Sequence, residues 1–221
     1  MTILRSVRRY LQVALDVTNI DVAVGISSEV ALGGADIIEV GTPLIKSCGM
    51  SSIPAIGEAA GPGKKILADM KTIDVGYLET QMAADSGANI TTVLASASDS
   101  TICEAVRAGS DLGIDIMVDL IGVSDPVSEG RRVEGLGADL LCIHSGIDEL
   151  GGDSPSFRGL REVAEQVSLP IFIAGGLNFQ NVIKAFDDGA SVAVVGRSIT
   201  LSRDPGNQTR MMAEIIHNYG R

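Results

Sequence analysis

A short segment recurs four times in this chain at nearly constant spacing. Each copy is a Gly-Ala step, then one polar residue, then apolar residues, and the alanines stand at positions 35, 88, 138 and 190, giving spacings of 53, 50 and 52. Four further apolar runs alternate with the copies: Leu11–Leu15, Lys65–Ala68, Ile114–Val118 and Leu169–Ala174. Eight short strands therefore alternate with segments long enough for helices. This pattern predicts a single (β/α)8 barrel over residues 1–221, and the double-unit period disfavours its main competitor, a doubly wound open sheet.

The segments between the predicted strands carry helix signals. Val75, Leu78 and Met82 have helical spacing, as have Val163 and Val167. The glycine of each Gly-Ala step falls where helices prefer a C-terminal cap. We therefore expect each copy of the repeat to close a helix and lead into a strand.

Composition excludes several classes of protein. Only 3% of the residues are aromatic and the formal net charge is −11, so neither base stacking nor phosphate attraction favours nucleic-acid binding. No apolar run reaches the length of a membrane span. The three cysteines, Cys48, Cys103 and Cys142, are widely spaced and form no CxxC motif, which predicts neither a disulfide framework nor a zinc site. We expect a soluble cytoplasmic protein in which Cys142 is a small buried hydrophobe.

Ionisable residues stand at the ends of the predicted strands, where barrels carry their active sites. Asp16, Asp69 and Asp119 end the first, third and fifth strands, Glu39 lies in the second, and His144 ends the sixth. Lys71 shares a strand face with Asp69, because residues two apart in a strand point the same way. Carboxylates gathered in one space repel one another, which raises some of their pKa values. A lysine and a divalent metal would relieve that repulsion.

Each of these residues also has a purely structural interpretation. The lysine–aspartate pair is compatible with a structural ion pair, and the other two aspartates are compatible with N-caps of the following helices. Glu39 is compatible with an acceptor of hydrogen bonds from a loop, and His144 with a satisfied structural histidine. Their occurrence together, on the face where barrels do chemistry, favours a functional site.

The last two predicted strands carry a different signal. The seventh runs into Gly175-Gly176 and the eighth into Gly196-Arg197-Ser198. The loops after these strands form the common phosphate site of barrels. Glycine lets backbone N–H groups approach phosphate oxygens, and an arginine adds charge-assisted hydrogen bonds. We therefore expect a phosphate ester whose reacting end lies near Asp69, Lys71 and His144.

The order of these motifs resembles that of the orotidine 5′-monophosphate decarboxylase suprafamily. The matching segments, spread over essentially the whole chain, are Leu15-Asp16, Ile38-Glu39-Val40-Gly41-Thr42, Asp69-Met70-Lys71-Thr72-Ile73-Asp74, Val118-Asp119, His144, Ala174-Gly175-Gly176 and Val195-Gly196-Arg197-Ser198. The D-x-K-x-x-D element from Asp69 to Asp74 is quite specific. More narrowly, the chain is similar to the branch that contains hexulose-phosphate synthases and 3-keto-L-gulonate-6-phosphate decarboxylases.

The resemblance implies a magnesium-dependent enzyme that forms an enediolate of a pentulose or hexulose phosphate, with Mn²⁺ as an alternative metal. By this resemblance Glu39 and Asp69 would ligate the metal, whose preferred ligands are oxygens. Lys71 would stabilise the enediolate charge, and His144 would move the proton at substrate C1.

The same resemblance implies a homodimer with shared active sites. Asp74 would reach the active site of the neighbouring subunit. Asp16 and Asp119 would orient Lys71 and substrate hydroxyls.

Two positions discriminate within the branch. The decarboxylases carry an arginine three positions after the histidine, where this chain has Ile147, and they tend to carry glutamate where it has Asp119. Both positions favour the synthase reaction, a reversible aldol condensation of D-ribulose 5-phosphate with formaldehyde to D-arabino-3-hexulose 6-phosphate. The alternatives are decarboxylation of 3-keto-L-gulonate 6-phosphate, decarboxylation of orotidine 5′-monophosphate, and sugar-phosphate binding without catalysis.

Overall fold

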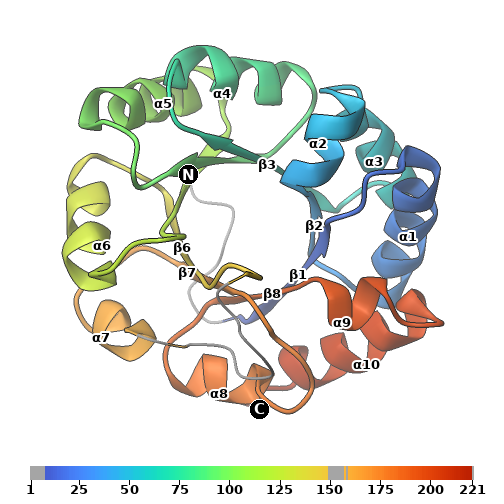
Figure 1. The fold of residues 1–221 in the computed structure, drawn as a ribbon. Helices are drawn as coiled ribbons and strands as arrows, with labels where there is room; N and C mark the ends of the chain where they lie inside the picture. The colour runs from blue at the N-terminus through green and yellow to red at the C-terminus, as the bar shows by residue number, and fades with distance from the viewer. Residues whose placement is uncertain (1–7, 149–156, 158, 221) are drawn as a thin grey trace.

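Eight parallel strands close into a barrel in the computed structural model, which describes residues 8–148, 157 and 159–220 (Figure 1). The strands are β1 Tyr10–Leu15, β2 Ile37–Val40, β3 Lys65–Thr72, β4 Ile90–Leu94, β5 Asp115–Asp119, β6 Leu140–His144, β7 Ile171–Ala174 and β8 Val192–Val195. Each pairs with its neighbours in sequence, and β8 pairs with β1. The predicted (β/α)8 barrel is confirmed, and the open sheet is excluded.

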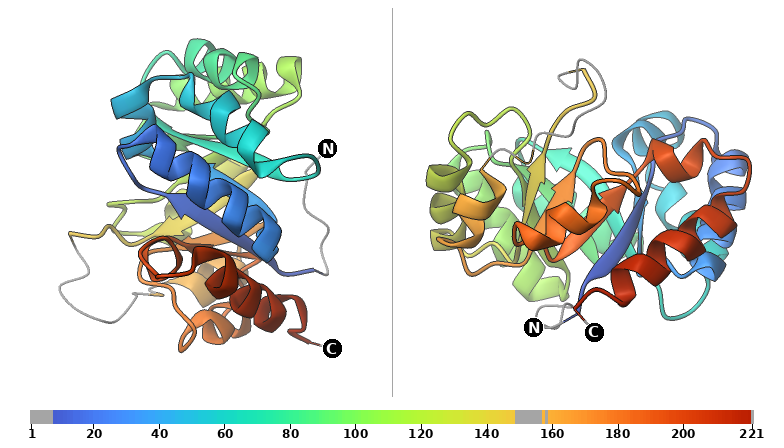
Figure 2. Two further views of the ribbon diagram at one scale, coloured as in Figure 1. Left: turned by 90° about the vertical axis from the view of Figure 1, so that its right-hand side faces the viewer. Right: turned by 90° about the horizontal axis from the view of Figure 1, so that it is seen from below.

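Helices connect the strands and cover the outside of the barrel, as the two side views of Figure 2 show. They are α1 Ile20–Gly33, α2 Thr42–Cys48, α3 Ser52–Ala60, α4 Gly76–Asp85, α5 Asp99–Leu112, α6 Pro126–Gly135, α7 Leu160–Ala164, α8 Val182–Asp187, α9 Arg197–Thr200 and α10 Pro205–His217. Among the described residues, none of these helices has the length and apolar character that a membrane crossing requires.

The repeated segment has one structural role in its four copies. Each glycine has a positive φ, between 90° and 109°, and the following alanine donates its N–H to a carbonyl of the preceding helix, as Ala35 does to Val30. This backbone turn ends a helix and suits glycine because a left-handed conformation strains other residues. The next strand then begins two residues after each alanine, at Ile37, Ile90, Leu140 and Val192. The predicted helix ends are confirmed.

The polar residue in three of the four copies joins neighbouring strands. Side-chain oxygens of Asp36, Asn89 and Asp139 each accept a 2.9 Å hydrogen bond from a backbone N–H of the preceding strand. The donors are Leu11, Ile66 and Ile116. The polar position of the repeat therefore satisfies a partly buried backbone donor at the amino end of the barrel.

Side chains along each strand alternate between two apolar cores. Leu11, Val13 and Leu15 of β1 belong to the core between the barrel and its helices. The opposite parity fills the barrel interior with Ala14, Ile37, Leu67, Ile90, Met117, Leu140, Cys142, Phe172, Ala174, Val192 and Val194. Gln12 and Glu39 also occupy inward-facing positions of their strands. Near the carboxyl ends of the strands, the inward-facing positions carry polar groups that lie close together.

Candidate active site

A cleft of about 1090 Å³ opens at the carboxyl ends of the strands. Ten of the residues predicted from the sequence line it: Asp16, Glu39, Asp69, Lys71, Asp119, His144, Gly175, Gly176, Gly196 and Arg197. Asp74 lies outside this lining, exposed between β3 and α4, where its Oδ1 accepts the Val75 N–H at 2.8 Å. The chain therefore gathers the predicted residues into one cavity, except for the one expected to serve a neighbouring subunit.

Lys71 is the cationic centre of the cleft. Its Nζ lies 2.6 Å from Oδ2 of Asp69 and 3.2 Å from Oδ2 of Asp119. Burial disfavours the ammonium, but the two carboxylates outweigh it and raise the pKa of Lys71 above its ordinary value. Lys71 therefore stays charged at neutral pH.

The backbone at Lys71 departs from the regular strand expected from the sequence. Lys71 has a φ of +48°, and the pairing of β3 with β4 shifts register between Ala68 and Thr72. The expectation that Asp69 and Lys71 converge is correct, but simple alternation along a strand is the wrong reason. A non-glycine residue in this region is strained and is held there by its surroundings, here by a 2.8 Å hydrogen bond from its N–H to Thr92 Oγ1.

Asp69 is buried and fixed from three sides. Its Oδ2 accepts hydrogen bonds from Lys71 at 2.6 Å and from Thr42 Oγ1 at 2.7 Å, and its Oδ1 accepts one from Thr92 Oγ1 at 2.8 Å. A carboxylate offers about four lone-pair directions, so room for a further ligand remains on Oδ1. The carboxylate is held rigidly and can still bind a cation.

Asp119 and His144 form a second pair, at the ends of β5 and β6. Oδ2 of Asp119 lies 2.9 Å from Nδ1 of His144, and Oδ1 accepts the Ile121 N–H at 2.9 Å. Burial opposes the charge on Asp119, yet His144, Lys71 and the Ile121 N–H together lower its pKa. The helix-capping alternative is wrong for both Asp16 and Asp119, because side chains of Asn19 and Asp125 cap α1 and α6.

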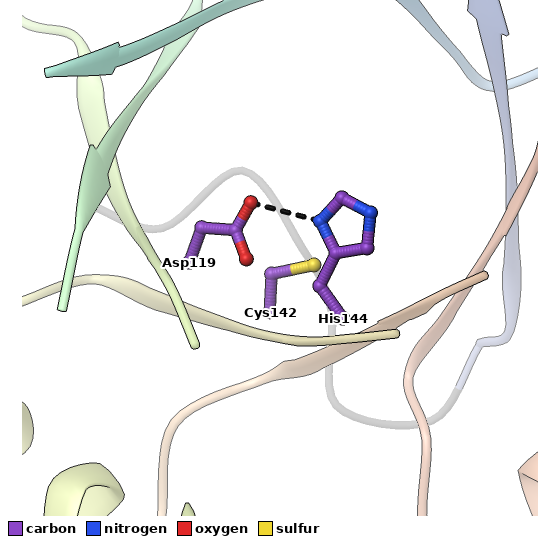
Figure 3. A group of neighbouring side chains, drawn as sticks. All are labelled: Asp119, Cys142 and His144. Atoms are coloured by element: carbon purple, nitrogen blue, oxygen red, sulfur yellow. Dashed lines mark hydrogen bonds and ion pairs between the residues drawn. The ribbon is translucent and has the colours of Figure 1, made fainter. Parts of the chain in front are cut away.

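Cys142 lies beside this pair. It is buried as expected, but it points into the barrel and lines the cleft together with Asp119 and His144 (Figure 3). Burial, with the charge of Asp119 adding to it, raises the pKa of the Cys142 thiol well above its ordinary value. The thiol is therefore protonated at neutral pH and is no nucleophile in this state.

Glu39 is a buried carboxylate held by an amide. Gln12, which is 1% exposed, donates from Nε2 to Oε2 of Glu39 at 2.5 Å. Burial, and then the charges of Asp69 and Asp16, raise the pKa of Glu39 well above its ordinary value. Of the three buried side-chain polar atoms without a hydrogen-bond partner among the described residues, one is Oε1 of Gln12. The alternative of a loop partner for Glu39 is not what the structure shows, since its partner lies in β1.

The donor set suits a hard divalent cation. Asp16, Glu39 and Asp69 bring three carboxylates against the single ammonium of Lys71, and burial together with the charges of the two aspartates favours the protonated form of Glu39. Surrounding protein and the charge of Asp69 raise the pKa of Asp16 also, although its side chain is open to solvent at the mouth. An oxygen-rich, electrically unbalanced space with an unpartnered amide oxygen fits Mg²⁺ or Mn²⁺.

The glycine loops after β7 and β8 form the other end of the cleft. Gly175 and Gly176 have φ values of +103° and +70°, and a Cβ on Gly175 would meet the Ser145 carbonyl oxygen at 2.3 Å. Both positions therefore require glycine. Arg197 is exposed at the start of α9 and lines the same cavity. An anion placed here would meet backbone N–H groups and a guanidinium.

Sequence reasoning missed the polar residues that hold the charged ones. These are Gln12, Thr42 and Thr92. A signal was present for Gln12, because it is a polar residue inside an otherwise apolar strand, and for Thr92, because it shares the inward-facing side of its strand with Ile90. Thr42 is the last residue of the matching segment that contains Glu39, but nothing in its spacing points to Asp69.

Comparisons with known proteins agree with this geometry. A family model described as "Orotidine 5'-phosphate decarboxylase / HUMPS family" matches residues 9–212. The 3-hexulose-6-phosphate synthase of Mycobacterium gastri is 40% identical over 93% of this chain and 99% of its own. A crystal structure of 3-hexulose-6-phosphate synthase matches with a TM-score of 0.88 at 39% identity, covering 94% of this chain and 99% of that one. The structure of 3-keto-L-gulonate-6-phosphate decarboxylase from Vibrio cholerae O1 matches with a TM-score of 0.77 at 25% identity, covering 96% and 98%.

Proposed function

The chain belongs to the orotidine 5′-phosphate decarboxylase / HUMPS family, and on that premise we propose that it is an aldehyde-lyase of the 3-hexulose-6-phosphate synthase type. It would join D-ribulose 5-phosphate and formaldehyde reversibly to D-arabino-3-hexulose 6-phosphate. The observation that carries this proposal is the 40% identity to the Mycobacterium gastri synthase over nearly the full length of both chains. The site agrees with it, because Ile147, which is 52% exposed and lines the cleft, stands where the decarboxylase branch carries arginine.

Lys71 and His144 would carry the proton chemistry and the charge. Asp119 holds Nδ1 of His144, so Nε2 is the nitrogen left to take or return the proton at substrate C1. The enediolate that results carries negative charge next to Lys71, whose ammonium is already fixed by Asp69 and Asp119. A preorganised charge of this kind needs little rearrangement as the reaction proceeds.

Glu39 and Asp69 would hold Mg²⁺, or Mn²⁺, because they present hard oxygen donors in a buried space with excess negative charge. When bound, the cation supplies Lewis-acid polarisation of adjacent substrate oxygens. Gln12 and Thr92 hold these two carboxylates by hydrogen bonds, which would limit their rotation around a bound cation.

The phosphate would bind at Gly175, Gly176, Gly196 and Arg197. Two of these glycines have backbones that other residues adopt only under strain, and the arginine brings a positive charge to the same end of the cleft. Asp16 packs against the neighbouring loop so closely that a Cβ on Gly41 would meet its Oδ1 at 2.3 Å. Asp16 and Asp119 would then orient substrate hydroxyls and Lys71.

A homodimer would complete the site. The segment after β3 and the first turns of α4 expose four large apolar residues: Ile73 by 53%, Val75 by 52%, Leu78 by 54% and Met82 by 39%. Leu78 and Met82 do lie in α4, as their spacing predicted, but they are on a face of the helix that is exposed. Contact between two such faces would remove the apolar area from water and place Asp74, within the same segment, against the partner.

The cytoplasm is the compartment that we propose. All three cysteines are free, and Cys103 is exposed, which suits a reducing environment. The net charge of −11 favours solubility and disfavours nucleic-acid partners.

The proposal is tested by incubating the purified protein with ribulose 5-phosphate, formaldehyde and Mg²⁺. We expect formaldehyde to disappear in a reaction that stops in EDTA. If formaldehyde stays constant while 3-keto-L-gulonate 6-phosphate releases CO₂, the protein is a decarboxylase instead. Full activity on orotidine 5′-monophosphate in EDTA would assign it to the metal-free branch.

A further inference from the structure

Three different metal-binding groups meet on one side of the cleft. Asp119 and Cys142 are register partners on the paired strands β5 and β6, and His144 lies two residues further along β6. One ligand atom from each of these residues, namely a carboxylate oxygen, the thiol sulfur and a ring nitrogen, lies within 4.8 Å of the other two. Figure 3 shows the thiol of Cys142 directed toward the Asp119–His144 contact.

We propose that Asp119, Cys142 and His144 form a second metal site, selective for a thiophilic divalent cation such as Zn²⁺, and that its occupation switches the enzyme off. Sulfur, imidazole and carboxylate together select transition metals over Mg²⁺. Zn²⁺ lies about 2.0–2.3 Å from such donors, so two ligand atoms of a tetrahedral site are about 3.3–3.8 Å apart. Small side-chain rotations therefore suffice to bring all three onto one ion.

The expectation that the cysteines form no zinc site came from their spacing in sequence. That argument applies to structural sites, whose ligands stand close together along the chain. Here the three ligands come from two strands, and the fold assembles them. Three protein ligands beside an open cleft leave the fourth position to water or substrate, the arrangement of an exchangeable site.

Occupation of this site is incompatible with the proposed role of His144. The ion would take Nδ1 of His144 from Asp119, and it would weaken the 3.2 Å contact between Asp119 and Lys71. The thiol of Cys142 would give its proton to solvent on binding. The nearby ammonium of Lys71 repels a cation, so we expect exchangeable rather than permanent binding.

Cobalt makes the proposal testable without turnover. The purified protein is titrated with Co²⁺ in excess Mg²⁺, which would fill the proposed site at Glu39 and Asp69. We expect one equivalent of Co²⁺ to give a sulfur-to-cobalt charge-transfer band in the near ultraviolet, displaced by one equivalent of Zn²⁺. Cys142→Ser should lose the band, and Cys142→Ala provides a second variant should the serine protein fold poorly. Cys103→Ser, at an exposed thiol on α5, is the matched control and should keep it.

Inhibition is the second measurement. Zn²⁺ should abolish formaldehyde consumption by the parent protein and by Cys103→Ser, and it should affect Cys142→Ala at least tenfold less. Absence of the band, its displacement by Mg²⁺, or equal Zn²⁺ inhibition of Cys142→Ala would each overturn the proposal. The inhibition test rests on the proposed function, but the spectrum does not. A protein inactive as a synthase that still shows the Cys142-dependent band would contradict only the function.

Discussion

Gln12 is a buried amide on the inward-facing side of β1, in a largely apolar barrel interior. Its Nε2 holds Oε2 of Glu39, and its Oε1 lacks a partner among the described residues. An unsatisfied buried oxygen costs about 1–3 kcal/mol, and an apolar replacement would remove this cost together with the hydrogen bond to Glu39. A role in orienting Glu39 for a cation would account for an amide at this point.

Replacing Gln12 separates this orienting role from stability. Gln12→Leu should weaken Mg²⁺ or Mn²⁺ binding about 10- to 100-fold, the range seen when partners of metal ligands are removed. Thermal stability should change little, because removal of the buried Oε1 offsets the lost hydrogen bond to Glu39. Mn²⁺ titration followed by electron paramagnetic resonance measures the affinity directly. Unchanged affinity in a folded Gln12→Leu protein would refute the role.

Glu39 should make the metal-free protein less stable as the pH rises. Its folded-state pKa is raised above the ordinary 4.5, so the folded protein binds the proton more tightly than the unfolded chain does. Stability is therefore greatest below the ordinary pKa and falls as the pH rises through the folded-state pKa. Thermal unfolding in EDTA between about pH 5 and pH 8 should show this fall.

Two comparisons isolate Glu39 from the other acids. Glu39→Gln should flatten the pH dependence and raise the melting temperature near neutral pH, by about 2–4 °C for each kcal/mol gained. Saturating Mg²⁺ should restore the stability of the parent protein but not change that of the variant. A variant that melts below the parent in EDTA would show that the carboxylate stabilises the fold.

At the scale of elements, the repeat explains how the strands keep their register. Asp139 accepts the Ile116 N–H at 2.9 Å, at the amino end of the barrel, far from the chemistry along the strands. Asp139→Ala would leave that donor unpaired and should destabilise the protein by about 1–2 kcal/mol, with little change in kcat. Denaturant unfolding measures the loss, and Asp139→Asn, which keeps an acceptor oxygen, should recover most of it. Equal stability of the two variants would contradict the strand-joining role.

The elements that the sequence predicted well are those whose signal is local. Apolar runs, glycine at helix ends and a constant spacing specify the eight strands, and the barrel rule then places Asp69, Asp119 and His144 at one end. The backbone of Lys71 was not predictable in this way. Its φ of +48° depends on Thr92 and on a register shift between β3 and β4, which are contacts between strands that no pattern along one strand contains.

The same limit applies to burial on the helices. Leu78 and Met82 have the spacing of a core-facing stripe, but they are 54% and 39% exposed. Spacing shows that residues share a face, and only packing decides whether that face meets the barrel or something else. Gln12 is the converse case. Glutamine usually lies at the surface, but the alternation of side chains along β1 turns Gln12 into the barrel, where it is buried.

At the scale of the whole molecule, Asp74 is the predicted site residue that its own barrel does not bring into the cleft. It is exposed outside the cleft of its own barrel, in the segment that carries the exposed apolar residues. If two such faces meet in a homodimer, each subunit lends its Asp74 to the other and keeps its Lys71. Two inactive variants, Lys71→Ala and Asp74→Ala, would then complement each other in a mixed dimer.

Co-expression with two affinity tags isolates that mixed dimer. One of its two sites would lack both residues and the other would have both, so we expect about half the activity of the parent dimer. A mixed dimer of parent and Lys71→Ala subunits is the control and should show the same half, because one site is again intact. If Asp74 serves its own barrel, both sites of the first hybrid carry a defect and it stays inactive, while the control keeps its half. The comparison therefore distinguishes a shared active site from two independent ones, whatever the strength of the dimer contact.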